Sequence, residues 1–401
     1  MLQIDWPEYV LRVLDALERA GFESWAVGGC VRDALLGRAP HDWDVCTLAT
    51  PPEMRRALAG FHLVDTGEKH GTLTAVIGGE PVEITTFRAD GAYTDHRRPD
   101  GVSFVRNLRE DLARRDFTVN AMACHPVRGL ADYFGGQEDL RRGLIRCVGD
   151  ADERFNEDGL RLLRALRFAA RFRFAIETET ARALRRNRGL LKWIARERVL
   201  SELRGTLLAQ GAPEILAAYP EVIAAAVPEM ETEGEAWTRA LAALREAPDD
   251  FSVRLALFVN ERNAAELLAN LKTDSRTRDD VLALTRHQGD EPPRDAPGAR
   301  RLLFALGESR ARMLCEMWRA QGREGAQEAA AQVEAALARQ DCYTQAQLKI
   351  GGRQLTALGL RGVAVGETLR ALLFAVMDER VENEEGALLQ EAERLAGEKA
   401  Q

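Results

Sequence analysis

The region between Trp25 and Thr50 restricts what this chain can fold into more than any other part of the sequence. Its residue pattern predicts a strand, a Gly-Gly turn, a short helix and a second strand that begins with Asp42 and Asp44. Side chains of a strand alternate between two faces, so both carboxylates are expected on the same face. Two neighbouring carboxylates repel each other unless a cation lies between them, and their oxygens are ligands that suit Mg²⁺.

The Gly-Gly turn is a candidate anion site. Gly28 and Gly29 let backbone amides approach a phosphate closely, and a helix that starts at Cys30 would add its positive dipole end. Arg32, in the first turn of that helix, could reach the same anion. An isolated Asp-x-Asp pair is usually a surface turn. The prediction of a site for a metal-bound nucleoside triphosphate therefore depends on the order of strand, Gly-Gly turn, helix and second strand with Asp-x-Asp.

Strand patterns continue to about residue 87. Residues 61–77 and 82–87 predict further strands, separated by a turn at Gly78-Gly79. In the last of these strands Glu83 is the candidate third carboxylate, although an exposed strand residue would show the same pattern. A sheet with helices packed against it indicates an α+β head domain over residues 1–148.

The second half of this head carries weaker patterns. Residues 88–102 are charged and rich in Gly and Pro, which predicts a long mobile loop. A helix is expected to begin at Arg114, where Arg115 and Asp116 could hold phosphate and ribose hydroxyls. A capped helix with a local ion pair is the alternative interpretation of these residues. Residues 132–140 are expected to form a loop around a second Gly-Gly turn.

Helical patterns replace strand patterns after Gly149 and continue to the end of the chain. We divide this remainder into residues 149–210, 211–330 and 331–401. Proline-broken, Ala- and Leu-rich helices without a catalytic pattern fill the middle segment.

A polar ridge is expected on the helix predicted over residues 155–168. Asp158, Arg161 and Arg164 lie three residues apart, so they are neighbours on one helix surface. Asp158 offers hydrogen-bond acceptors and Arg161 a rigid fork of donors, which together could pair with the Watson–Crick edge of a base. From these residues alone, an intrahelical salt bridge between Asp158 and Arg161 is the simpler interpretation.

Charge is unevenly distributed along the chain, whose net charge is −8. Residues 141–204 contain 17 Lys and Arg against 9 Asp and Glu. Such a basic segment is a candidate surface for a phosphate backbone, although a solvated helical surface rich in arginine would have the same composition.

Six scattered cysteines without a Cys-x-x-Cys pair predict reduced thiols in a cytoplasmic protein. The chain starts without a signal-peptide pattern, and no apolar run approaches the ~20 residues of a membrane span.

Several motifs follow one another in a defined order. They are Gly-Gly-x-Val-Arg-Asp with Asp-x-Asp at 28–44, Arg-Arg-Asp-Phe-Thr-x-Asn-Ala at 114–121, Gly-Gly-x-x-Asp-Leu at 135–140, Glu-Asp-x-x-Arg at 157–161, and a helix at 196–203. In this order the sequence resembles the class II tRNA nucleotidyltransferases, the bacterial CCA-adding enzymes of the nucleotidyltransferase and poly(A) polymerase superfamily. The resemblance is detailed over about residues 20–205, and the helical remainder resembles the shorter bacterial form.

The resemblance implies template-independent addition of CCA to the 3′ end of tRNA from CTP and ATP, with release of pyrophosphate. It implies two Mg²⁺ ions bound by Asp42 and Asp44, with Glu83 as a further catalytic carboxylate. Asp158 and Arg161 would read the base of the incoming nucleotide. The nucleotide-binding residues that it implies are Gly28, Gly29, Arg32, Arg115, Asp116, Asp158, Arg161, Arg164 and Arg167.

The same resemblance assigns the parts of the chain. Residues 1–148 would be the catalytic head, 149–210 a neck that selects the base, 211–330 a body and 331–401 a tail. The neck and tail would bind the acceptor stem and elbow of tRNA. Neither a membrane nor a protein partner is implied.

Related activities remain alternatives. A poly(A) polymerase shares the head, but residues 65–72 resemble the CCA-adding form and no strongly basic tail follows. A CC-adding enzyme lacks much of the loop before the Arg-Arg-Asp motif, whereas residues 88–113 look full length. An A-adding enzyme shares these motifs. A non-catalytic RNA-binding relative would not need the intact pair Asp42 and Asp44.

Overall fold

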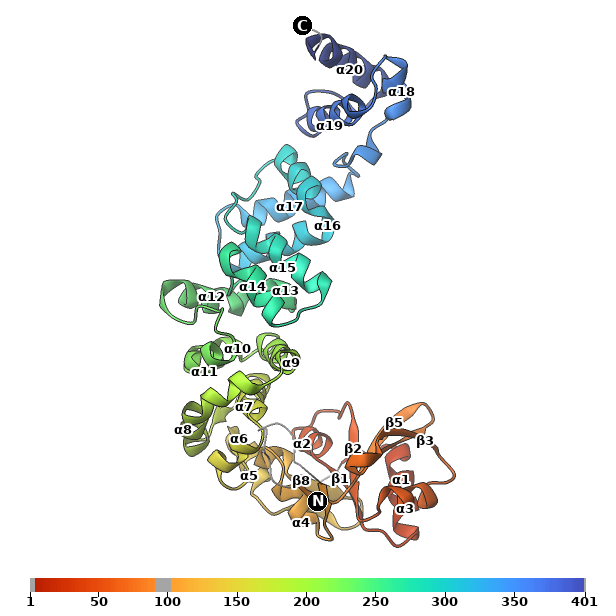
Figure 1. Cartoon of the computed structure of the whole chain (residues 1–401), viewed down its shortest axis with the longest axis vertical. Coiled ribbons are helices and arrows are strands. Elements are labelled where there is room, and N and C mark those ends of the chain that lie inside the picture. Colours follow the sequence, from red (N-terminus) through yellow and green to blue (C-terminus); the bar gives the residue numbers. More distant parts are fainter. Residues whose placement is uncertain (1–3, 91–101, 400–401) are drawn as a thin grey trace. The chain divides into compact units, whose positions relative to one another are not determined.

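The computed structural model describes residues 4–90 and 102–399. The chain folds as two compact units, Met1–Pro228 and Glu229–Gln401. Strands and helices together build the first unit, whereas the described part of the second unit contains helices alone (Figure 1). The α+β prediction is confirmed by this arrangement. All six cysteines are buried and free of disulfides, as expected for reduced thiols.

Seven strands form the main sheet of the first unit, in the order β3-β4-β5-β2-β1-β8-β9. Strand β1 is buried at all four residues and pairs antiparallel with β2 and β8. Strands β2 and β5 run parallel to each other. The seven strands are β1 Ser24–Val27, β2 Trp43–Thr47, β3 His62–Gly67, β4 Thr72–Ile77, β5 Glu80–Thr86, β8 Met122–His125 and β9 Gly129–Asp132.

Strand β2 alternates between buried and exposed residues in the part that carries the predicted site. Trp43 and Val45 are buried on either side of the exposed Asp44. The ring of Trp43 packs against Trp6, with ring centroids 5.3 Å apart. Because side chains alternate along a strand, this packing leaves Asp44 on the opposite face of the sheet.

The first helices follow from local residue patterns. Helix α1 (Glu8–Arg19) buries Val10, Val13, Leu14 and Leu17, which recur at helical spacing and form one apolar stripe. Helix α2 spans Gly29–Leu35 and helix α3 spans Pro51–Ala57. The backbone N–H of Thr50 donates to Glu53 over 2.8 Å, which caps the start of α3.

The prediction of a single loop over residues 88–102 was wrong at both ends. Strand β6 (Arg88–Asp90) pairs antiparallel with strand β7 (Val102–Phe104). The rest of the predicted loop, residues 91–101, lies outside the described residues.

The prediction of a helix that begins at Arg114 was also wrong. Helix α4 (Leu108–Ala113) ends there instead, and Arg115 and Asp116 lie in the connection to a short 3-10 turn, η2 (Thr118–Asn120). The backbone of Phe117 is extended and forms an isolated antiparallel β-bridge with Cys147. This agrees with the preference of aromatic residues for extended backbone. Further along, helix α5 (Gly136–Arg142) occupies most of the loop predicted at 132–140.

The helix predicted over residues 155–168 is in fact two helices. Helix α6 (Ala151–Glu157) ends at Asp158, whose backbone is extended, and helix α7 (Leu160–Phe172) follows. A Cβ atom on Gly159 would lie 3.1 Å from Leu190, so a close approach by residues of η3 accompanies the break. The remaining elements of this unit are β10 Leu144–Ile145, β11 Ala175–Ile176, α8 Thr178–Asn187, η3 Arg188–Trp193, α9 Arg196–Leu207, α10 Ala212–Ala218 and α11 Pro220–Ala226, with η1 at Glu68–His70.

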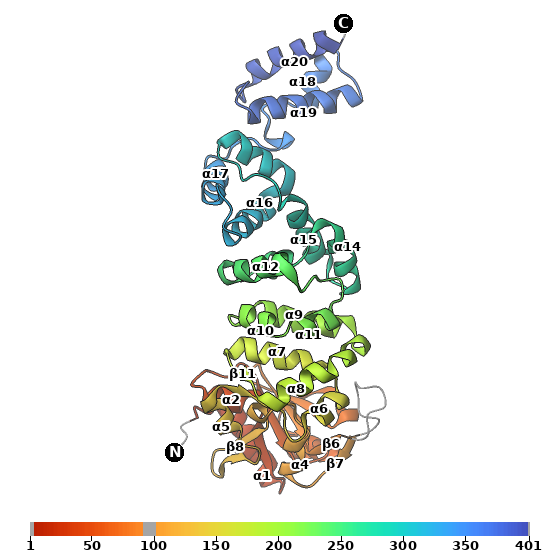
Figure 2. The ribbon, with the colours of Figure 1, turned by 90° about the vertical axis from the view of Figure 1, so that its left-hand side faces the viewer.

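The second unit is a series of helices (Figure 2). Helix α16 is interrupted at Gly307, whose φ is 73° and ψ is 170°. The helices are α12 Gly234–Glu246, α13 Phe251–Ala256, α14 Glu261–Asn270, α15 Ser275–His287, α16 Ala296–Ala320, α17 Ala326–Ala338, η4 Gln345–Gln347, α18 Gly352–Ala357, α19 Val363–Met377 and α20 Glu385–Lys399.

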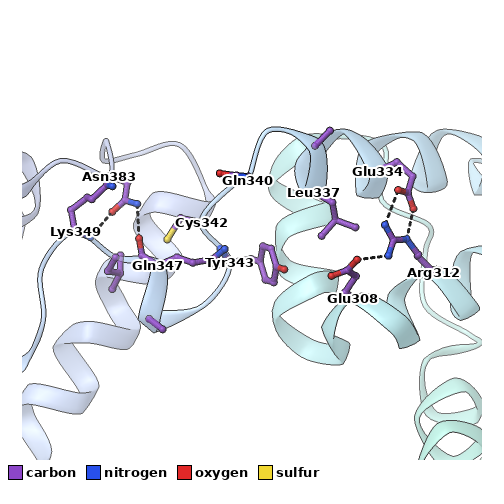
Figure 3. A pocket seen from close by; sticks show the side chains of 13 residues that line it. Glu308, Arg312, Glu334, Leu337, Gln340, Cys342, Tyr343, Gln347, Lys349 and Asn383 are labelled. Atoms are coloured by element: carbon purple, nitrogen blue, oxygen red, sulfur yellow. Dashed lines mark hydrogen bonds and ion pairs between the residues drawn. The ribbon is translucent and has the colours of Figure 1, made fainter.

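A cavity of about 850 Å³ lies in this second unit. Arg312 and Glu334 line one side, and Gln347 and Lys349 line the other (Figure 3). All residues that line this cavity belong to the second unit, whereas the predicted carboxylates belong to the first. Across residues 4–90 and 102–399, every helix is too short or too polar to cross a lipid bilayer.

Candidate active site

The predicted carboxylates meet on neighbouring strands. The parallel register of β2 and β5 pairs Asp44 directly with Glu83, and both side chains are exposed on the sheet. Asp42 lies in the bend just before β2 and is also exposed. The structure thus brings the three predicted carboxylates, Asp42, Asp44 and Glu83, into one region of the surface.

This arrangement raises the pKa of Asp44. Its pKa is raised to about 6, first because surrounding protein displaces solvent around the carboxylate, and then because Glu83 and Asp42 repel its charge. Arg115 acts in the opposite direction but does not cancel these effects. The region therefore holds more negative charge than its own side chains neutralise, which favours binding of a cation.

The carboxylates do not form a closed metal cage. Within residues 4–90 and 102–399, no three His, Cys, Asp or Glu side chains are grouped closely enough to hold a metal ion by themselves. Mg²⁺ commonly takes one or two carboxylates and completes its shell with water and substrate phosphates. The uncompensated charge around Asp44 fits an open site of that kind.

Arg115 connects these carboxylates to the Gly-Gly turn. Gly28 has a φ of 81° and donates its backbone N–H to Met122 over 3.0 Å. A Cβ atom on Gly28 would lie 2.9 Å from Nη1 of Arg115, so the absent side chain leaves room for the guanidinium. Among the described residues, the buried Nε of Arg115 has no hydrogen-bond partner. A phosphate at this turn would supply one.

Arg32 is placed differently from the prediction of a simple phosphate ligand. It is buried, and its Nε donates to Asp33 over 2.8 Å while Nη1 donates to the side chain of Asn120. Asn120 in turn donates to Asp116 over 3.0 Å. Arg32 thus links helix α2 to the Arg-Arg-Asp motif, and a Cβ atom on Gly29 would lie 3.6 Å from its Nη2.

Asp116 begins a chain of ion pairs that reaches across the helices. Arg164 pairs with Asp116 at 2.7 Å and lies 3.9 Å from Glu202, and Arg167 donates to Glu202 over 2.5 Å. Burial alone would raise the pKa of Asp116, but the charge of Arg164 and the hydrogen bonds of Asn120 and Arg164 lower it to about 2. Glu202 therefore joins Arg164 to Arg167, and Arg164 connects both to Asp116.

Asp158 and Arg161 each have a separate partner. Nη2 of Arg198 donates to Asp158 over 2.9 Å, and the backbone N–H of Leu160 donates to Asp158 over 3.0 Å. Arg161 pairs with Glu157 and donates to the backbone carbonyl of Arg114 over 3.0 Å. The structure therefore places both predicted base-reading residues at the break between α6 and α7, held by neighbours.

Four contributors were missed by the sequence analysis: Asn120, Glu157, Arg198 and Glu202. Each stands inside a motif that the analysis singled out, at 114–121, 157–161 or 196–203. Arg198 lies 40 residues from Asp158, and Glu202 lies 38 residues from Arg164. Local periodicity cannot show such pairings, so motif membership was the available signal.

Comparison with known proteins identifies domains of one family in both units. A model described as the poly A polymerase head domain matches residues 24–146. One described as a probable RNA and SrmB-binding site of polymerase A matches residues 173–218, and one for tRNA nucleotidyltransferase domain 2 matches residues 229–392.

Individual relatives agree with these matches. The chain is 36% identical to a CCA-adding enzyme of Lactobacillus helveticus over 399 residues, which is 94% of each protein. It is 48% identical to a CCA-adding enzyme of Staphylococcus aureus over 191 residues, covering 48% of this chain and 47% of the relative. The crystal structure of the Bacillus stearothermophilus CCA-adding enzyme in complex with CTP superimposes with a TM-score of 0.82 at 30% identity, covering 98% of both chains.

Proposed function

Because the chain belongs to the family of CCA-adding enzymes, we propose that it adds CCA to the 3′ end of tRNA, using CTP and ATP and releasing pyrophosphate. The observation that carries the proposal is the placement of Asp44, which has Asp42 and Glu83 close by, beside Arg115 and the Gly-Gly turn. The enzyme acts in the cytoplasm, where its buried, unpaired cysteines would stay reduced.

The carboxylate region performs the transfer. Asp42 and Asp44 would hold the two Mg²⁺ ions, and Glu83 increases the negative charge around Asp44. Mg²⁺, when bound, supplies the positive charge that favours ionisation of the attacking hydroxyl and neutralises the leaving pyrophosphate. Gly28, Gly29 and Arg115 hold the triphosphate beside these carboxylates.

The neighbouring ion-pair chain selects and orients the nucleotide. Asp158 and Arg161 present acceptors and donors to the base, and Arg198 and Glu157 fix their positions. Asp116 and Arg164 lie between the base-reading pair and Arg32, where Asp116 can accept from a ribose hydroxyl. A protein surface of this kind chooses CTP or ATP without a nucleic-acid template.

The helical parts bind tRNA. We assign residues 1–148 to a catalytic head, 149–210 to a neck, 211–330 to a body and 331–401 to a tail. The basic neck contacts the acceptor stem and the tail contacts the elbow. Because these contacts neutralise phosphates, the affinity for tRNA falls steeply as salt increases.

Extension of three labelled tRNA transcripts tests the activity. The transcripts end before CCA, after C and after CC, and each is incubated with Mg²⁺ and CTP, ATP or both. The proposal expects all three to be extended to CCA and no further. A stop after CC, or extension of the CC-ended transcript alone, would reveal a CC-adding or A-adding enzyme. A long A tail would reveal a poly(A) polymerase. The absence of any product would indicate a non-catalytic RNA-binding protein.

A further inference from the structure

Three arginines gather around a single aromatic ring beside the Gly-Gly turn. The guanidinium carbons of Arg32, Arg38 and Arg171 lie 4.7, 5.4 and 5.5 Å from the ring centroid of Phe172. The ring of Phe168 stacks on Phe172 with centroids 6.0 Å apart. Cation–π attraction helps to hold guanidinium groups at such distances.

These arginines are not equally neutralised. Arg32 pairs with Asp33 at 2.8 Å and is buried. Arg38 and Arg171 are both exposed, and within residues 4–90 and 102–399 neither forms an ion pair with a carboxylate. The pKa of Arg32 is lowered, mainly by burial, and the charge of Arg171 contributes in the same direction. The group around Phe172 therefore carries excess positive charge.

Local structure fixes the position of both exposed arginines. Helix α2 ends at Leu35 and is followed by Gly37 with a φ of 67°, and the backbone N–H of Arg38 donates to the carbonyl of Asp33 over 2.9 Å. Arg38 therefore starts the loop that leads to Asp42, four residues later. Arg171 lies in the last turn of α7, three residues after Phe168.

The cluster is continuous with the site already described. Arg32 reaches toward Gly29, since its Nη2 would lie 3.6 Å from a Cβ atom there, and its guanidinium also contacts the Phe172 ring. A phosphate chain that begins at the carboxylates and follows the Gly-Gly turn would reach the exposed arginines after it passes Arg32.

We propose that Arg38 and Arg171 bind the β- and γ-phosphates of the incoming nucleotide and hold pyrophosphate as it leaves. The inference rests on the proposed function. In the transfer step the RNA 3′-oxygen bonds to the α-phosphorus and its proton goes to solvent. The bond from that phosphorus to the bridging oxygen breaks, and pyrophosphate departs with the electron pair. Guanidinium groups suit this product because they donate two parallel hydrogen bonds to phosphate oxygens.

Inorganic pyrophosphate is the direct probe. Its dissociation constant would be measured by calorimetry on the full chain with Mg²⁺ and without tRNA, for the wild type, Arg38→Ala, Arg171→Ala and both lysine variants. Each alanine variant is expected to weaken binding about tenfold, as for loss of one charge-assisted contact, and the lysine variants less. Arg19→Ala removes an exposed arginine of α1 that is paired with Asp15, and it should leave binding unchanged.

Steady-state kinetics separates nucleotide phosphates from RNA phosphates. The proposal expects KM to rise for both CTP and ATP while KM for tRNA stays within about twofold, because the triphosphate is common to both nucleotides. A rise in KM for tRNA with unchanged pyrophosphate binding would overturn it in favour of an RNA backbone contact. Alanine variants that match Arg19→Ala in both assays would overturn it as well. Pyrophosphate binding is measured without RNA, so it tests this site even if the three transcripts show a different addition pattern.

Discussion

Two carboxylates of the first unit, Asp44 and Asp116, experience opposite environments. Burial would raise the pKa of either one. At Asp44 the neighbouring Glu83 and Asp42 add to that effect, and the pKa reaches about 6. At Asp116 the charge of Arg164 and the hydrogen bonds of Asn120 and Arg164 reverse it, and the pKa falls to about 2.

The difference separates a region that needs a ligand from one that is already assembled. The strand carboxylates are left short of positive charge, so a cation bound there would relieve repulsion as well as serve the chemistry. The residues between α4, α7 and α9 neutralise one another without a ligand. A protein that selects a base with side chains needs those side chains held in place before the nucleotide arrives.

The largest expected effect is the loss of nucleotide transfer when a carboxylate of the strand region is removed. Asp42→Ala and Asp44→Ala should each lower the rate of CMP addition by at least about a thousandfold, because the removed oxygens would hold the catalytic cation. Glu80→Ala removes an exposed carboxylate at the start of β5 and is the matched control. Circular dichroism should show an intact fold, and near-normal turnover in either aspartate variant would contradict the assignment.

The largest stability effect is expected in the assembled region. Asp116→Asn should lower the free energy of unfolding by about 2 kcal/mol at pH 7, since a folded pKa of about 2 stabilises the ionised form. Because the folded pKa lies below the unfolded value, this stabilisation is complete above about pH 5 and is lost as pH falls toward 2. Urea unfolding at pH 7 and pH 3 should therefore show a smaller difference at the lower pH.

An exposed ion pair provides the comparison for that measurement. Glu179 pairs with Arg182 on the surface of α8. Glu179→Gln should change the free energy of unfolding by about 0.5 kcal/mol or less. Equal effects of the two substitutions would mean that Asp116 contributes no more than a surface charge.

Base selection should depend on a residue that the base need not touch. Arg198→Ala frees Asp158 and is expected to reduce discrimination between CTP and a noncognate nucleotide by about tenfold to a hundredfold. Arg196→Ala is the control, because Arg196 lies on the same helix and donates instead to the carbonyl of Ala226 over 2.6 Å. The measurement is kcat/KM for CTP and UTP on a tRNA that lacks CCA. Unchanged discrimination would show that Arg198 does not position Asp158 for selection.

A smaller effect than that of Asp116→Asn, and of opposite sign, is a gain in stability at the active site. Without metal, Asp44→Asn should raise the free energy of unfolding at pH 8 by about 1 kcal/mol or less, after allowance for solvent screening of an exposed group. The folded pKa lies above the unfolded value, so the ionised carboxylate destabilises the fold and the gain should vanish as pH falls below about 4. Thermal unfolding with and without Mg²⁺ measures this, and Mg²⁺ should stabilise only the wild type. A variant less stable than the wild type at pH 8 would contradict it.

Patterns within about ten residues were predictable. The stripe of α1, the Thr50 cap of α3, and the strand–turn–helix–strand region with Asp42 and Asp44 all follow from alternation, helical spacing and capping preferences. The break at Asp158 was not predictable in the same way. Residues 155–168 have helical periodicity throughout, and a tertiary contact of Gly159 with Leu190 accompanies the interruption.

The sequence by itself determined which chemical groups are available and where along the chain they stand: carboxylates in Asp-x-Asp, glycines before a helix, and arginines at helical spacing. Only the tertiary structure decided their partners. The parallel register of β2 and β5 sets Glu83 against Asp44, and α9 brings Arg198 to Asp158 and Glu202 to Arg164 and Arg167. The physical reason is range, because backbone preferences act over a few residues, whereas the fold brings charges from distant segments to within a few ångströms of each other.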